Sequence, residues 1–221
     1  MTALPAEFAP LTEGRLLVVP FAQPHRALSW AVSGGGFRRV RTVVWRQVGD
    51  AELARGIDPE RLLAAALAPF PDPIGLLTAR DIHRFDDVTL GEGNLTARCV
   101  ATVGLGNALA IGDPPGPLRQ VGTINLLCQL SRPLSDGALV EAISLATEAR
   151  TAAMLAAHVP SRRSTGWATG TGTDCIIVAT PEGVGAGERY AGKHTSLGAL
   201  IGQSVGAAVS RGIARWQAEQ Q

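Results

Sequence analysis

The pattern of apolar and polar positions predicts strands in the first half of the chain and alternating strands and helices in the second half. Short apolar runs bounded by Gly, Pro or Asn are typical of strands. In the first half these runs lie at residues 16–19, 28–32, 37–45, 74–78, 88–90 and 95–103. Glycine-rich turns at 33–36 and 91–94 separate two pairs of runs, so we expect two β-hairpins.

Three helices are expected from their start signals. Asp58-Pro59 places an N-cap carboxylate before a proline at the first helical position, and this helix should end before Pro69. Ser135 is expected to cap a long, largely buried helix that runs to about residue 158. Thr195 or Ser196 is expected to cap the last helix, to about residue 217. Apolar strands at 122–128 and 176–179 lie between these helices.

The last helix carries glycines at a spacing of four. Gly198, Gly202 and Gly206 therefore share one helix face. We expect that face to pack closely on a sheet.

The elements together predict a mixed α/β (α+β) fold. It would have N-terminal β-hairpins, a central sheet and long helices packed on that sheet. The chain has no internal repeat and no linker that would divide it. We therefore expect a single domain over residues 1–221, with its core at about 15–217.

Composition narrows the class of protein. Of 221 residues, 46% are hydrophobic and 18% charged, which favours a packed core over disorder. The formal net charge of +1 argues against a nucleic-acid partner, because such a partner needs a basic face. The longest apolar tract, Leu197 to Val209, is too short to span a membrane, and no signal peptide is visible. We expect a cytoplasmic protein without a membrane partner.

The three cysteines, Cys99, Cys128 and Cys175, lie in separate apolar runs. Their number and spacing fit neither a disulfide framework nor a zinc motif. Buried, reduced thiols are the expectation.

The stretch from Thr165 to Asp174 is the main candidate for chemistry, because glycines alternate with hydroxyl residues and end on a carboxylate. One interpretation is an anion or oxyanion cradle made by backbone N–H groups, with a threonine hydroxyl as donor or nucleophile. The other is a tight turn whose threonines bond their own backbone. The spacing alone does not decide between the two. The motif is neither a Walker loop nor a dinucleotide fingerprint.

His194 is a second candidate, at the expected start of the last helix. A histidine there can act as general acid and base near neutral pH, or can make one structural hydrogen bond. The other histidines, His25, His83 and His158, share no metal spacing with it, so no histidine-based metal site is expected.

Glu148 lies midway along the predicted long helix, where a buried carboxylate would need a partner or a function. Asn125 interrupts an apolar strand and must find partners if it is buried. Asn107 and Asp113 are weaker candidates in glycine-rich surroundings.

The order of several segments resembles the adenosylcobinamide amidohydrolase family of corrinoid salvage. The matching segments are 28–35, 75–79, 104–108 with 112–113, 122–125, 147–152, 168–174 and 190–195. The combination of Thr-Gly-Thr-Gly-Thr-Asp with the later Gly-Lys-His-Thr is the specific part of the resemblance. It extends over roughly residues 15 to 212.

The resemblance implies hydrolysis of the amide that links aminopropanol to the corrin ring of adenosylcobinamide. Its products would be adenosylcobyric acid and 1-aminopropan-2-ol, for use in coenzyme B12 synthesis. Cobalt would enter as part of the substrate, so neither a cofactor nor a protein-bound metal is expected. A corrinoid-binding or chaperone protein without activity is the alternative. Which corrinoid is preferred and whether the chain forms a homo-oligomer stay open.

Four residues are assigned to catalysis on this basis: His194, Asp174, Glu148 and Thr173. His194 would act as base and later as acid, with Asp174 orienting it or a water, and Thr173 or nearby N–H groups would stabilise the oxyanion. A covalent route through Thr171 or Thr173 is the rival. Substrate binding is assigned to Gly34, Gly35, Asn107, Asn125, Thr169, Thr171, Gly172, Lys193 and Thr195.

Overall fold

The computed structural model describes residues 9–49, 52, 58–116, 121–183 and 187–220. Its elements in chain order are β1 (Leu11–Glu13), β2 (Leu16–Ser29), β3 (Gly36–Gln47), α2 (Pro59–Leu67), β4 (Pro73–Thr78), β5 (Phe85–Glu92), β6 (Leu95–Val103), β7 (Ala108–Leu109), β8 (Ile124–Leu130), α3 (Asp136–Ala156), β9 (Gly170–Thr171), β10 (Cys175–Pro181) and α4 (Ser196–Ala218).

One mixed sheet organises the chain. Its strand order is β4-β3-β2-β10-β8-β6-β5, with β1 paired to β2 as the eighth strand. The pairs β3–β4 and β8–β10 are parallel, and the other pairs are antiparallel. β7 and β9 form a separate two-stranded sheet. The expected mixed α/β class is confirmed.

Both predicted hairpins are present, as β2–β3 and β5–β6. The prediction of two short strands at 16–19 and 28–32 is wrong, because β2 runs without a break from Leu16 to Ser29. Its pairing with β3 shifts register between Pro20 and His25. An irregularity of this kind accommodates a proline inside a strand.

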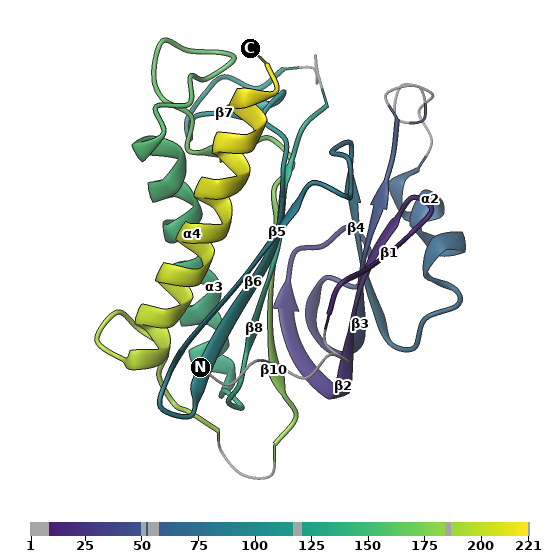
Figure 1. The fold of residues 1–221 in the computed structure, drawn as a ribbon, viewed down its shortest axis with the longest axis vertical. Coiled ribbons are helices and arrows are strands. Elements are labelled where there is room, and N and C mark those ends of the chain that lie inside the picture. Colours follow the sequence, from purple (N-terminus) through teal and green to yellow (C-terminus); the bar gives the residue numbers. More distant parts are fainter. Residues whose placement is uncertain (1–8, 50–51, 53–57, 117–120, 184–186, 221) are drawn as a thin grey trace.

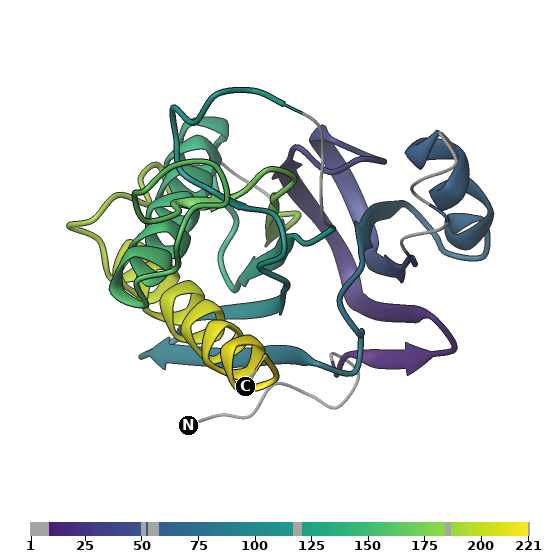
Figure 2. The same ribbon diagram turned by 90° about the horizontal axis from the view of Figure 1, so that it is seen from above.

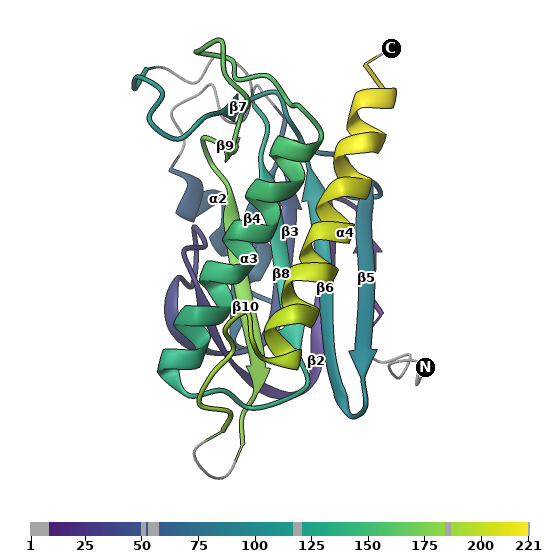
Figure 3. The same ribbon diagram turned by 90° about the vertical axis from the view of Figure 1, so that its left-hand side faces the viewer.

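The helices form a layer on one face of the sheet. Figures 1 and 3 show α3 and α4 side by side over β10, β8, β6 and β5. Apolar side chains such as Leu126, Ile176, Leu139 and Ile201 form the core between these layers. The shorter α2 lies on the other side of the molecule, beside the N-terminal strands (Figure 2).

The opposite face of the sheet is curled around a second core, which includes Leu127, Ile177 and Trp45. The curl brings the edge strand β4 close to the start of β8. Asn125 Nδ2 donates to the carbonyl oxygen of Leu77 at 2.7 Å, although β3, β2 and β10 lie between the two strands in the sheet order. Asn125 is 1% exposed, and its amide finds the partners that the sequence required.

The predicted helix starts are confirmed. Asp58 accepts from Glu60 N at 3.0 Å, Ser135 Oγ from Ala138 N at 3.3 Å, and Thr195 Oγ1 from Gly198 N at 2.9 Å. Each cap satisfies an N–H group that has no partner within its helix. Among the described residues, no helix is long and apolar enough to cross a membrane.

The expectation that the glycine face of α4 packs on the sheet is wrong. A Cβ atom at Gly202 or Gly206 would meet nothing within 4 Å. The sheet-facing side of α4 instead carries buried apolar residues such as Ile201 and Val205. Gly212 makes the close approach, since a Cβ there would lie 2.5 Å from Val103 Cγ2.

Candidate functional site

The carboxylate of Asp174 is the centre of a buried cluster immediately before β10. Oδ1 accepts from the backbone N of Ile124 at 3.1 Å and from Thr171 Oγ1, and Oδ2 accepts from Thr171 N at 3.0 Å. The guanidinium of Arg150, on α3, places Nη1 2.9 Å from Oδ2. The Asp174 side chain is only 7% exposed. Four segments of the fold therefore meet at one carboxylate.

The pKa of Asp174 is raised above its ordinary value. Burial is the largest cause, because it disfavours the charged form. The positive charge of Arg150 and the hydrogen bonds from Thr171 and Ile124 act in the opposite direction. A buried carboxylate with a raised pKa, in contact with a hydroxyl group, is an arrangement suited to proton transfer.

The glycines of the 165–174 stretch allow close packing more than they form an anion cradle. A Cβ at Gly172 would lie 2.7 Å from Asn107 Nδ2, and Gly172 N donates to the Asn107 carbonyl at 3.1 Å. Thr169 N donates to Leu109 O at 2.9 Å, and Thr171 N is already bonded to Asp174. The N–H groups of Thr169, Thr171 and Gly172 each have a partner inside the protein. The interpretation of the loop as an anion cradle therefore does not hold for these three N–H groups.

The hydroxyl groups of the loop differ in what they contact. Thr171 Oγ1 donates to the Asp174 carboxylate, whereas Thr173 Oγ1 donates to the carbonyl of Gly122 at 3.1 Å. Thr169 Oγ1 accepts from Ile111 N at 2.8 Å. Only Thr171 has its hydroxyl next to a base, while Gly172 and Thr173 are exposed beside it.

The turn that holds Gly34 and Gly35 packs against β4. Ser33 and Gly75 exchange backbone hydrogen bonds, and Gly34 has a φ of +82°, which favours glycine. A Cβ at Gly35 would lie 3.0 Å from Ala31 O. The backbone conformation explains the glycine at position 34, and close packing explains the glycine at position 35.

Arg150 and Trp30 lie in two of the segments that carry the resemblance, 147–152 and 28–35, but neither residue is assigned to the site from the sequence. Trp30 Nε1 donates to the Asp174 carbonyl at 2.6 Å, and its side chain is 45% exposed. The available signal for Arg150 was a basic residue in a largely apolar helix. No local pattern identifies Trp30, because its partner lies 144 residues away. Asp113, a weaker candidate, accepts from Ala110 N at 2.7 Å within its own loop and from Ser161 Oγ of the loop after α3.

The second predicted cluster, 190–195, lies at the beginning of α4. Ala191 N donates to the Glu141 carboxylate at 2.7 Å, and Thr195 serves as the cap of α4. His194 is exposed. Lys193 Nζ forms an ion pair with Glu148 Oε2 at 2.7 Å, and the Glu148 side chain is 55% exposed. Glu148 therefore has the partner that the sequence analysis required, although it is not buried, because it lies on the outer face of α3.

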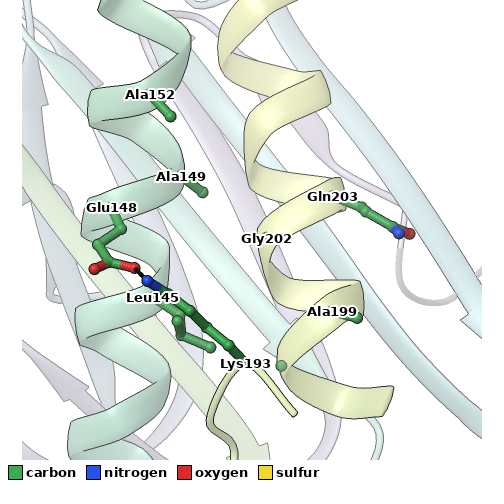
Figure 4. Close-up of a pocket in the computed structure, with 9 residues that line it drawn as sticks. Leu145, Glu148, Ala149, Ala152, Lys193, Ala199, Gly202 and Gln203 are labelled. Carbon is green, nitrogen blue, oxygen red and sulfur yellow. Dashed lines mark ion pairs between the residues drawn. The ribbon is translucent and has the colours of Figure 1, made fainter. Parts of the chain in front are cut away.

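The Lys193–Glu148 pair borders a groove between α3 and α4 (Figure 4). Small residues form most of its lining, including Ala149, Ala152 and Gly202, and its volume is about 410 Å³. Two of the predicted site residues are thus in contact here, at a place separate from Asp174.

His194 and Asp174 do not form the pair that the sequence suggested. Ala191 is held opposite Glu141 of α3, whereas Asp174 is held opposite Arg150. Glu141 and Arg150 are nine residues apart on α3, which is a rise of roughly 13 Å along the helix. In Figure 3, β10 begins near β9 at one end of the sheet, and α4 begins at the other end. The strand between the two motifs carries the chain away from Asp174 before it reaches His194.

The three cysteines are buried and free, as expected. Burial raises the pKa of Cys128 to about 12 and that of Cys175 to about 11. Neither thiol is a nucleophile at neutral pH. Within the described ranges, no three His, Cys, Asp or Glu side chains gather into a metal-binding group.

The fold and this cluster define an α/β protein with a buried acid and a hydroxyl group at one end of its sheet. The chain belongs to the adenosylcobinamide amidohydrolase family, whose model matches residues 5–221.

Two curated relatives and one solved structure resemble the chain. An adenosylcobinamide amidohydrolase of Halobacterium salinarum is 33% identical over 162 residues, which are 68% of this chain and 62% of the relative. An uncharacterized protein of Methanocaldococcus jannaschii is 39% identical over 90 residues, 40% of this chain and 34% of the relative. The chain thus aligns with less than two thirds of either relative. A crystal structure of a Pyrococcus horikoshii protein matches with a TM-score of 0.46 and 13% identity, over 96% of this chain and 83% of that chain.

Proposed function

We propose that the protein hydrolyses the amide between aminopropanol and the corrin ring of adenosylcobinamide. The products are adenosylcobyric acid and 1-aminopropan-2-ol. The family match over residues 5–221 is the observation that carries this proposal, and the name of the Halobacterium salinarum relative agrees with it. The cobalt ion belongs to the substrate.

The contact between Thr171 and Asp174 supports placing the reaction at these two residues. In a covalent route, Asp174 accepts the Thr171 proton as Oγ1 attacks the amide carbon, and then gives that proton to the departing amine. Water hydrolyses the resulting ester and restores the hydroxyl. In the rival route, Asp174 removes a proton from a water that attacks the amide directly.

Stabilisation of the oxyanion is assigned to Thr173. Thr173 is an exposed residue whose hydroxyl bonds the Gly122 carbonyl at 3.1 Å, and a rotation about χ1 would free this hydroxyl to donate to the substrate. Gly172 is exposed on the same turn, and its lack of a Cβ lets the turn pack against Asn107. Asn107 and Asn125 are buried and act by supporting the site.

The roles given to the second cluster change in this proposal. His194 is exposed just before α4, which begins at the other end of the sheet from the start of β10 (Figure 3), so we assign it no proton transfer at the buried Asp174. Lys193, Glu148 and Thr195 belong to the same second cluster. Any contact that they make with a corrinoid would be to its outer parts.

One observation favours a corrinoid-binding protein without activity as the second candidate. Each oxygen of Asp174 already has protein donors, which is also what a purely structural carboxylate would show.

Incubation of the purified protein with adenosylcobinamide, followed by mass spectrometry, separates the two candidates. The proposal expects adenosylcobyric acid and free aminopropanol in equal amounts. Binding of the corrinoid without either product would support the second candidate. Parallel incubations with cobinamide phosphate and a complete cobamide show which corrinoid the protein prefers as substrate. Dialysis against a strong chelator should leave the activity unchanged, and loss with rescue by zinc would contradict a metal-free site.

A further inference from the structure

We infer that Arg150 is a positioning residue for the proposed reaction, and that Gly170 provides the space that Arg150 needs. Arg150 would hold the carboxylate of Asp174 against Thr171 and fix the loop that carries both. This inference rests on the proposed function and adds two residues to its site.

The guanidinium of Arg150 joins helix α3 to both ends of the loop. Its Nη1 lies 2.9 Å from Asp174 Oδ2 and also donates to the carbonyl of Thr169. Thr151 Oγ1, the next residue of α3, donates to the same carbonyl at 3.1 Å. The first and last residues of the 169–174 loop are therefore tied to one helix turn, with Thr171 between them.

Gly170 lies directly over this ion pair. A Cβ atom at Gly170 would overlap Arg150 Nη1 and would lie 2.5 Å from Asp174 Oδ2. Any other residue at this position would therefore push the guanidinium away from the carboxylate. The glycine is required here by close approach, and its φ angle is not in the left-handed region.

The pair is buried, with the Arg150 side chain 10% exposed and that of Asp174 7% exposed. Removing one partner of such a pair leaves an unpaired charge in a water-poor place. Arg150 Nε has no hydrogen-bond partner among the described residues. The guanidinium is thus held by its Nη1 contacts, and a lysine ammonium that reached the same position could donate to the same two oxygens, Asp174 Oδ2 and the Thr169 carbonyl.

Arg150 also sets the charge environment of Asp174. Ile124 from β8, Thr171 from β9 and Trp30 from the end of β2 contact Asp174 through uncharged groups. Cys175 follows it in β10 and is neutral, because its pKa is about 11. Arg150 is the charged group that lowers the pKa of Asp174 against the effect of burial.

The test compares kcat/KM against pH for the wild type, Arg150→Met and Arg150→Lys. We expect the acid limb of Arg150→Met to move up by about one pH unit or more, since its base loses its cation. Arg150→Lys keeps a cation and should return the acid limb most of the way to its wild-type position. Arg98→Met is the matched control, because Arg98 is likewise a buried arginine, 4% exposed, and pairs with Asp87 on β5, away from Asp174. An unchanged acid limb in Arg150→Met, or the same shift in Arg98→Met, would overturn the inference.

Gly170→Ala is the second variant, and it keeps both charged groups. It should show the same upward shift of the acid limb. Gly166→Ala is its control in the same loop region, because a Cβ at Gly166 comes no closer than 3.8 Å to Ser164 Oγ. If Arg150→Met does not fold, Gly170→Ala decides the question, and a wild-type pH profile in Gly170→Ala would contradict our inference.

A second measurement separates a failure of the proposed function from a failure of the role given to Arg150. If the wild type releases no aminopropanol from adenosylcobinamide, titration of the Asp174 carboxyl by ¹³C NMR replaces the kinetic profile. Its midpoint should move up in Arg150→Met and in Gly170→Ala, and should stay in place in Arg98→Met and Gly166→Ala. Equal midpoints in wild type and Arg150→Met would overturn the role of Arg150, whatever the reaction.

Discussion

Arg150 Nη1 lies 2.9 Å from Asp174 Oδ2, and this contact joins the middle of helix α3 to the start of strand β10. Asp174 in turn accepts the hydroxyl of Thr171. The cation of Arg150 thus contacts the carboxylate of Asp174, which contacts the hydroxyl of Thr171, although α3 and the loop are separate segments of the chain. The proposed chemistry depends on this sequence of contacts.

Replacement of Thr171 tests the covalent route. Thr171→Val should lower kcat by at least about 100-fold, because the group that attacks the amide is lost. Thr171→Ser keeps the hydroxyl and should retain most of the activity. Thr147→Val is the control, since Thr147 Oγ1 bonds only the Ile143 carbonyl of its own helix at 2.8 Å. Full activity of Thr171→Val would exclude Thr171 as the attacking group.

Two glycines of α4 should respond in opposite ways to a methyl group. Gly202→Ala should raise the free energy of unfolding by roughly 0.5–1 kcal/mol, because the new Cβ meets nothing within 4 Å and alanine favours the helix. Gly212→Ala should lower it, because its Cβ would lie 2.5 Å from Val103 Cγ2. Urea unfolding of both variants measures this difference. A loss of stability in Gly202→Ala would show that this face of α4 is covered in solution.

His25 should make stability depend on pH. Burial lowers the pKa of this histidine, whose Nδ1 donates to the Gln23 carbonyl at 2.9 Å and whose ring stacks on Phe21. The unfolded chain therefore binds a proton near pH 6.5 that the folded chain does not bind. Its contribution to stability is present above that pH and is lost as the pH falls through the lower folded pKa.

The measurement is the free energy of unfolding in urea at pH 7.5 and at pH 5. The wild type should lose more stability between these values than His25→Asn does. His83→Asn is the control, because His83 is exposed. The same pH dependence in wild type and His25→Asn would contradict this assignment.

Local signals in the sequence predicted local structure well. Asp58, Ser135 and Thr195 each cap the helix that they were expected to cap, because a cap is decided within three residues. The runs at 16–19 and 28–32 predict two strands where the structure has one, since the register shift between Pro20 and His25 depends on pairing with β3. Gly202 was assigned to the sheet side of α4 because spacing shows which residues share a face, and does not show where that face points.

In the candidate site, too, the local features could be predicted from the sequence and the contacts between distant segments could not. The 165–174 stretch could be recognised from its composition. Thr171 bonds its own loop, as the turn interpretation expects, and its hydroxyl also contacts a carboxylate. The contact of Asp174 with Arg150 could not be found from spacing, because it depends on how α3 crosses the sheet. The distance of His194 from Asp174 arises in the same way, from the direction of β10.

The most direct measurement compares the turnover of adenosylcobinamide by Asp174→Asn and His194→Ala. The account predicts that Asp174→Asn loses at least about 100-fold in kcat, while His194→Ala stays within about threefold of the wild type. Near-normal turnover by Asp174→Asn, together with a collapse in His194→Ala, would contradict it and would place the reaction at the opposite end of the sheet.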